Sequence, residues 1–234
     1  MRKGITASGI AAAVSIALLG GTGQAFADSH ATAAPAKLTV AEYKSWLNRT
    51  PGASVTLKAF NRLTPAKQKA FVGYLQNAKV YKAFTAAQDG DIPGRAMKPT
   101  RYNNDVTFTS STTATARRAG NSTVISLSVT AAERIFNIPV TTVSTQLTYE
   151  TDRRHLITGR GEKVSHKGTN FNAAFAIKPS ASRIGPEANM LDGTTTWTAT
   201  PKYTSAGTKH IKKLQVVTGL GDHGWHSELI NLAS

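Results

Sequence analysis

The sequence predicts an α+β protein in which a small N-terminal helical unit precedes an antiparallel β-sandwich-like domain. Two observations predict this class. Apolar residues recur at helical spacing in residues 38–87. Residues 102–234 are instead rich in Thr, Ser and Val, and apolar and polar residues alternate there with a period of two. Between them, residues 88–101 are rich in glycine and proline, which indicates a linker.

The first 27 residues have the order of regions that is typical of a secretory signal peptide. Arg2 and Lys3 precede an apolar run from Ile10 to Leu19, and Ala25-Phe26-Ala27 has the small-x-small pattern of a cleavage site. We therefore expect cleavage after Ala27 and a secreted, extracellular protein. Residues 28–37 are rich in alanine and are expected to form a flexible lead-in. We expect no transmembrane segment in the mature chain, because no later apolar run is long enough.

Residues 38–87 contain two signals for the start of a helix. Thr39 followed by Glu42 is a capping box, and Thr64-Pro65 places a proline at the first helical position after a capping threonine. The spacing predicts two or three short helices. A unit of this size is only marginally stable alone, so we expect it to pack against another part of the protein.

Residues 102–234 show the two-residue period of half-buried strands. Ile125, Leu127 and Val129, for example, alternate with Ser126 and Ser128. Because each strand has one apolar face, two sheets are expected to pack face to face. Residues 179–193 are expected to form a long loop.

Part of the chain resembles a group of known sequences. The segment FNRLTPAKQKAFVGYLQN (Phe60–Asn77), the signal peptide and the Thr-rich β half are similar to uncharacterised secreted proteins of Streptomyces-type actinobacteria. The resemblance covers the general layout and one helical motif. It implies export, and it carries no catalytic or binding residue with it.

Composition narrows the classes of function. The chain has no cysteine, which excludes a disulfide scaffold and thiolate metal sites. The net charge of +15 becomes +13 when Arg2 and Lys3 are removed with the signal peptide. A field of this sign attracts polyanions. For an exported protein, we expect the partner to be an anionic cell-wall polymer or another extracellular polyanion.

The basic residues concentrate at predicted turns. If several of these turns lie at one end of the molecule, they form an anion-binding surface. The alternative is that the charges protect turns and strand edges from aggregation. The predicted anion-binding residues are Arg117, Arg118, Arg153, Arg154, Lys209, Lys212 and Lys213.

The segment Gly219-Leu220-Gly221-Asp222-His223-Gly224 matches the pattern G-x-G-x-x-G and follows a strand-like run. A dinucleotide site also requires a helix after the glycines and an acidic residue about 20 positions further on. Only residues 225–234 follow the motif in this sequence. We therefore expect no nucleotide to bind here.

The same segment contains a candidate metal site. If residues 222–228 were extended, Asp222, His226 and Glu228 would share one face of the strand, and these residue types bind zinc. The alternative is a turn at Asp222-His223-Gly224 with Trp225 packed beside it. The sequence contains no G-x-S-x-G and no H-E-x-x-H motif, so we assign no catalytic residue and no cofactor.

Together these features favour a non-enzymatic binding protein of the cell exterior or cell wall, which contacts anionic polymers through basic loop tips. Two alternatives stay open. One is an exported metal- or His-dependent hydrolase that uses the C-terminal histidines, and the other is a membrane-active β protein. The sequence does not indicate an oligomeric state.

Overall fold

Four short helices begin the part of the chain that the computed structural model describes, residues 35–187 and 189–233. The predicted signal peptide and the lead-in up to residue 34 lie outside the described residues. The helices are α1 (Val40–Arg49), α2 (Ser54–Asn61), α3 (Pro65–Leu75) and α4 (Ala78–Ala83). The fourth helix exceeds the predicted number because Asn77 starts a new helix directly after α3, its side chain accepting a hydrogen bond from the backbone N–H of Lys79.

Both predicted helix starts are confirmed. The Thr39 side chain accepts a hydrogen bond from the backbone of Glu42, and the Glu42 carboxylate accepts one from the backbone of Thr39. Thr64 caps α3 by accepting a hydrogen bond from the backbone N–H of Lys67, and Pro65 follows it. These caps satisfy N–H groups that have no partner inside the helix, so they fix where each helix begins.

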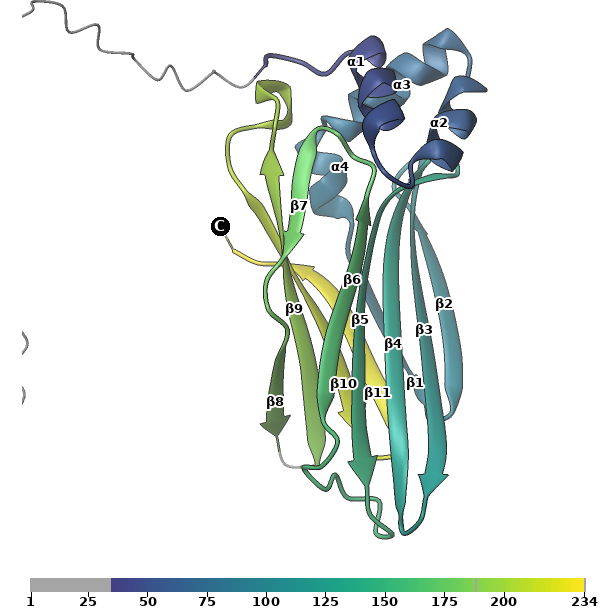
Figure 1. The fold of residues 1–234 in the computed structure, drawn as a ribbon, viewed down its shortest axis with the longest axis vertical. Helices are drawn as coiled ribbons and strands as arrows, with labels where there is room; N and C mark the ends of the chain where they lie inside the picture. The colour runs from purple at the N-terminus through teal and green to yellow at the C-terminus, as the bar shows by residue number, and fades with distance from the viewer. Residues whose placement is uncertain (1–34, 188, 234) are drawn as a thin grey trace, which may run out of the picture. The chain divides into compact units, whose positions relative to one another are not determined.

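Eleven antiparallel strands in two sheets follow the helices within the described residues (Figure 1), which confirms the α+β sandwich-like class. In spatial order, the six-stranded sheet contains β1 (Ala86–Asp91), β11 (Gly224–Asn231), β10 (Ile211–Leu220), β9 (Met190–Pro201) and β7 (Phe175–Pro179), and β8 (Arg183–Glu187) also pairs with β9. The five-stranded sheet contains β2 (Gly94–Arg101), β3 (Val106–Ala119), β4 (Ser122–Ile135), β5 (Ile138–Thr151) and β6 (Lys163–Asn170). A short 3₁₀ helix, η1 (Thr204–Ala206), lies between β9 and β10.

The predicted linker at residues 88–101 is wrong. This segment lies mainly in β1, which pairs with β11, and in β2, which pairs with β3. Its glycine and proline residues have other roles: Gly90 leaves room for the ring of Trp225, and Pro99 lies on β2, an edge strand, where a missing N–H is tolerated. The predicted loop at residues 179–193 is likewise mostly strand, because β8 pairs with the start of β9.

The two-residue period places one face of the long strands β4, β5, β9 and β10 between the sheets. Ile125, Leu127, Leu147 and Tyr149 are fully buried there. Polar side chains also cross this interface. Gln215 of β10 donates to the carbonyl of Val129 and accepts hydrogen bonds from other buried side chains of both sheets. The buried amide of Gln215 is thus paired through both its oxygen and its nitrogen, as its removal from water requires.

The helices share a hydrophobic core with one end of the sandwich. The ring of Tyr81 in α4 stacks on Phe175 of β7 with centroids 5.5 Å apart, and the hydroxyl of Tyr43 in α1 donates to the carbonyl of Phe171 at 2.9 Å. Residues 35–187 and 189–233 belong to one structural unit. The helical unit is therefore a cap on the sandwich, as its small size led us to expect.

The opposite end of the sandwich is formed by connections between strands. The β3–β4 turn (120–121), the β5–β6 loop (152–162) and the β10–β11 turn (221–223) all lie there, away from the helices (Figure 1). We call this the hairpin end. Within the described residues, no helix has the length and apolar character that would let it cross a membrane.

Candidate functional site

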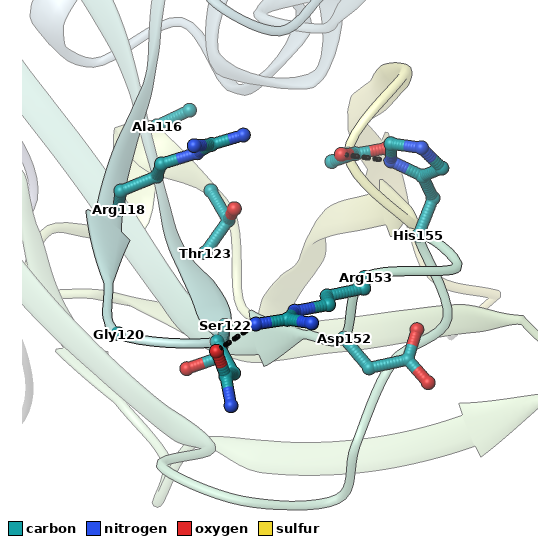
Figure 2. Close-up of a pocket in the computed structure, with 10 residues that line it drawn as sticks. Ala116, Arg118, Gly120, Ser122, Thr123, Asp152, Arg153 and His155 are labelled. Carbon is teal, nitrogen blue, oxygen red and sulfur yellow. Dashed lines mark hydrogen bonds and ion pairs between the residues drawn. The ribbon is translucent and has the colours of Figure 1, made fainter.

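A hollow of about 720 Å³ lies at the hairpin end. The β3–β4 hairpin contributes Arg118, the β5–β6 loop contributes Arg153 and His155, and the β10–β11 turn contributes Asp222. Figure 2 shows Arg118 and His155 on opposite sides of the hollow, with Arg153 between them and its guanidinium directed toward the β3–β4 turn. Three segments that are distant in the sequence therefore meet around one space.

Asp152 organises the loop that carries His155. Its Oδ1 accepts hydrogen bonds from the backbone N–H groups of Arg154, at 2.8 Å, and Leu156, at 3.0 Å. The bond from Leu156 is the largest of several contributions that lower the pKa of Asp152, because each stabilises the charged carboxylate. His155 adopts a left-handed backbone conformation with φ of 64°. The loop thereby turns the His155 side chain toward the β10–β11 turn.

The G-x-G-x-x-G segment contains a turn, which confirms the turn that the sequence offered as the alternative to a metal site. A Cβ at Gly219 would collide with the buried ring of Tyr149, and Gly221 has a positive φ of 62°. The Tyr149 hydroxyl donates to the carbonyl of Gly221 at 2.5 Å. The chain reverses at residues 221–223, and Trp225 is buried directly after the turn, as predicted.

This turn brings Asp222 and His223 to His155. Asp222 Oδ2 lies 2.6 Å from His155 Nδ1, and Asp222 Oδ1 lies 3.4 Å from His223 Nδ1. The two imidazole rings are 5.0 Å apart between centroids. The side chains of both histidines are exposed, whereas that of Asp222 is only 18% exposed. The cluster therefore places a largely buried carboxylate next to two solvent-accessible imidazoles.

The structure separates Asp222 from His226 and Glu228, the other two residues of the predicted metal site, which contact each other. Asp222 contacts His155 and His223, while His226 lies between two other carboxylates. His226 Nδ1 is 2.5 Å from Asp89 Oδ1, and His226 Nε2 is 3.1 Å from Glu228 Oε1. Partial burial acts to lower the pKa of His226, but the two carboxylates outweigh it and raise this pKa. An imidazole with both nitrogens engaged by carboxylates suits a strand-to-strand contact better than a metal ligand.

Four of the predicted anion-binding residues, in two pairs, lie at the hairpin end. Arg117 and Arg118 are exposed at the end of β3. Because adjacent residues of a strand point to opposite sides, Arg118 faces the hollow and Arg117 faces away from it. Arg153 donates a hydrogen bond to the Asn121 side chain. Arg154 forms an exposed ion pair with Asp152 at 3.4 Å.

Lys209 and Lys212 lie at the opposite end of the sandwich. Both are exposed beside η1 and α4, where they line a second hollow of about 420 Å³ together with Lys82. The predicted basic turns thus belong to two separate surfaces.

Lys213 does not lie on either surface, which corrects its prediction as an anion-binding residue. It is 1% exposed, because the alternation along β10 turns residues 211, 213, 215 and 217 inward. Its ammonium group lies 5.1 Å from the ring centroid of Tyr81 and donates to Asn231 Oδ1 at 2.7 Å. Burial lowers the pKa of Lys213 to about 7, although the charge of Glu133 opposes this shift.

Sequence reasoning missed two features of these surfaces. The pairing of His155 with Asp222 left no local signal, since 67 positions separate the two residues. The charge of the helical unit did leave a signal in the composition. Residues 35–84 contain a single acidic residue, Glu42, and nine basic ones. The basic residues are Lys37, Lys44, Arg49, Lys58, Arg62, Lys67, Lys69, Lys79 and Lys82.

Comparisons of the chain with protein-family models, with curated proteins and with solved structures gave no match. The functional argument therefore depends on the geometry and charge described above.

Proposed function

We propose that this chain is a secreted, non-enzymatic protein that binds an anionic polymer of the cell exterior or cell wall. The observation that carries the proposal is the meeting of two basic turns around one hollow. Arg118 comes from the β3–β4 hairpin and Arg153 from the β5–β6 loop, and both line the hollow at the hairpin end. An anionic group that enters the hollow therefore meets two guanidinium groups.

The chemistry of these groups suits a phosphate or carboxylate ligand. A guanidinium presents a planar set of donors that matches both anions and stays charged at all physiological pH values. Within the described residues, neither Arg118 nor Arg153 forms an ion pair with a carboxylate. Their charges are therefore available to a ligand.

The helical unit supports the same function at longer range. Eight of the nine basic residues in residues 35–84 are exposed, and Glu42 is the single acidic residue of this segment. A surface of one charge sign raises the local concentration of an oppositely charged polymer and speeds its association, and salt screens this attraction.

The test measures binding of soluble poly(glycerol phosphate) by calorimetry across a range of sodium chloride concentrations. We expect affinity to fall as salt rises, because each contact with a phosphate releases counterions. The double variant Arg118→Ala/Arg153→Ala should weaken binding by about tenfold or more, which corresponds to about 1.4 kcal/mol. Arg117→Ala is the matched control, because it removes one guanidinium that faces away from the hollow.

Two results would contradict the proposal. The first is absence of binding at low salt, which would exclude a polyanion as the partner. The second is unchanged binding in the double variant together with loss of binding in Lys58→Glu/Arg62→Glu. That result would locate the binding surface on the helical unit and not at the hollow.

A further inference from the structure

The cluster of His155, Asp222 and His223 combines residue types that bind transition metals. Each of the three offers one ligand atom, and these atoms all lie within 4.8 Å of one another. Imidazole nitrogen together with carboxylate oxygen is a donor set that zinc accepts readily, whereas calcium and magnesium prefer oxygen alone.

One separation in the cluster matches the ligand spacing of a small tetrahedral ion. Metal–ligand bonds of about 2.1 Å place two ligands of a tetrahedron about 3.4 Å apart. Asp222 Oδ1 lies 3.4 Å from His223 Nδ1. The shorter separation of 2.6 Å between Asp222 Oδ2 and His155 Nδ1 is that of a hydrogen bond, whose proton a metal ion would displace.

An unsatisfied oxygen provides an independent indication. Asp222 Oδ1 is buried, yet it makes no hydrogen bond of ordinary geometry with any described residue. A buried carboxylate oxygen without a hydrogen bond is unfavourable, and a cation bound at this point would compensate it. The tight turn holds the oxygen in place, because Gly221 is fixed by the hydroxyl of Tyr149.

The neighbours of the cluster indicate what its ion would face. His155 and Asp222 line the same hollow as Arg118 and Arg153. Three protein ligands leave a fourth tetrahedral position, which is the arrangement of zinc sites that bind an exogenous ligand. A cation near two guanidinium groups is favoured when an anion lies between them, since the anion is attracted to all three charges.

We propose that His155, Asp222 and His223 bind one zinc-type divalent ion, and that this ion and Arg118 together bind a phosphate or carboxylate group in the hollow. The metal site stands on the geometry of the cluster alone. The capture of an anion rests on the proposed function, and it would make the ion part of the polymer-binding surface.

The first experiment titrates zinc chloride into the untagged, chelator-stripped protein by calorimetry. We expect one ion per chain. His155→Ala and Asp222→Asn should each raise the dissociation constant of zinc by at least about tenfold. His210→Ala is the matched control, because His210 is exposed and bonds to Thr200, outside the cluster. Circular dichroism checks that each variant is folded.

The metal site would be refuted by the absence of saturable zinc binding. It would also be refuted if His155→Ala bound zinc as the unmodified protein does, or if His210→Ala weakened binding equally. Magnesium binding with the same affinity would contradict the donor set.

The second experiment titrates inorganic phosphate, below the solubility limit of its zinc salt, into the protein with and without zinc. We expect zinc to tighten phosphate binding by at least about tenfold and Arg118→Ala to reverse most of this gain. If zinc binds but the affinity for phosphate is unchanged, the proposal that the ion captures an anion is wrong. Absence of polymer binding by the unmodified protein both with and without zinc would instead contradict the proposed function.

Discussion

Glu133 illustrates how a single residue position sets the response of this protein to pH. Its carboxylate is 1% exposed, and neither oxygen makes a hydrogen bond of ordinary geometry with the described residues. Burial raises the pKa of Glu133 to about 7, although the nearby Thr141 hydroxyl and the charge of Lys213 oppose the shift. The residue lies on β4, near Tyr43 and Tyr81 of the helical cap. Burial raises the pKa of both tyrosines, and the charge of Glu133 raises it further.

The raised pKa of Glu133 predicts a loss of stability between pH 5 and pH 7. Over this range the folded protein keeps a proton that the unfolded chain, with a pKa of 4.5, releases. The folded state therefore binds more protons, so the free energy of unfolding falls as pH rises, by roughly 2 kcal/mol from this group over this range. In Glu133→Gln, the free energy of unfolding measured in urea should change much less between these pH values.

The control for this prediction is Glu162→Gln, which removes a carboxylate from the exposed loop before β6. It should preserve the pH dependence of the unmodified protein. Above pH 7 the buried Lys213 acts in the opposite direction, because its pKa is lowered to about 7 from 10.5 and the unfolded chain then binds more protons. An unchanged slope in Glu133→Gln would contradict the assignment to Glu133.

The β10–β11 hairpin shows how an element depends on close packing across the two sheets. Gly219 belongs to the six-stranded sheet, and Tyr149, whose ring covers it, belongs to the five-stranded sheet. The hydroxyl of the same tyrosine holds the turn through Gly221. The position of Asp222, and with it the candidate metal site, therefore depends on a contact between sheets.

Gly219→Ala should destabilise the protein by about 1–3 kcal/mol, because the added Cβ collides with a ring that is fully buried and cannot move aside. The measurement is the midpoint and slope of urea unfolding. Gly185→Ala on β8 is the matched control, since a Cβ there meets no atom within 4 Å. Equal stability of the two variants would show that Tyr149 does not constrain Gly219.

At the scale of the whole molecule, the helices and the sandwich share one core. Phe84, at the end of α4, packs against Phe108 of β3 with centroids 5.3 Å apart, and Tyr81 packs on Phe175. The helices lack a core of their own that is closed against the solvent, because their buried residues belong to the cluster that includes strand residues. Unfolding either part would expose the apolar surface of the other.

We therefore expect the helices and the sandwich to unfold in a single transition. The chain has three tryptophans, so in a Trp46→Phe background the fluorescence reports only Trp197 and Trp225, both buried in the sandwich. Circular dichroism at 222 nm reports the helices. The two signals should give the same urea midpoint. Loss of the helical signal at a lower urea concentration would show that the cap is independently unstable.

The sequence by itself determined the features that depend on neighbouring residues. Thr39 with Glu42 and Thr64 with Pro65 identified helix starts, because a cap acts within one turn of the backbone. The alternation of Ile125, Leu127 and Val129 identified a strand with one buried face, and the glycines after β10 favoured the turn. The class of the fold followed from these local patterns.

Only the tertiary structure decided which distant segments meet. The segment predicted to be a linker forms β1 and β2. The hydrogen-bond partner of β1 is β11, which is distant in the sequence, and that of β2 is the neighbouring strand β3. Composition does not reveal such partners. Lys213 is buried because the phase of β10 turns it toward the core. Asp222 contacts His155, 67 positions away in the sequence, because the β5–β6 loop and the β10–β11 turn both lie at the hairpin end. No spacing in the sequence encodes that proximity.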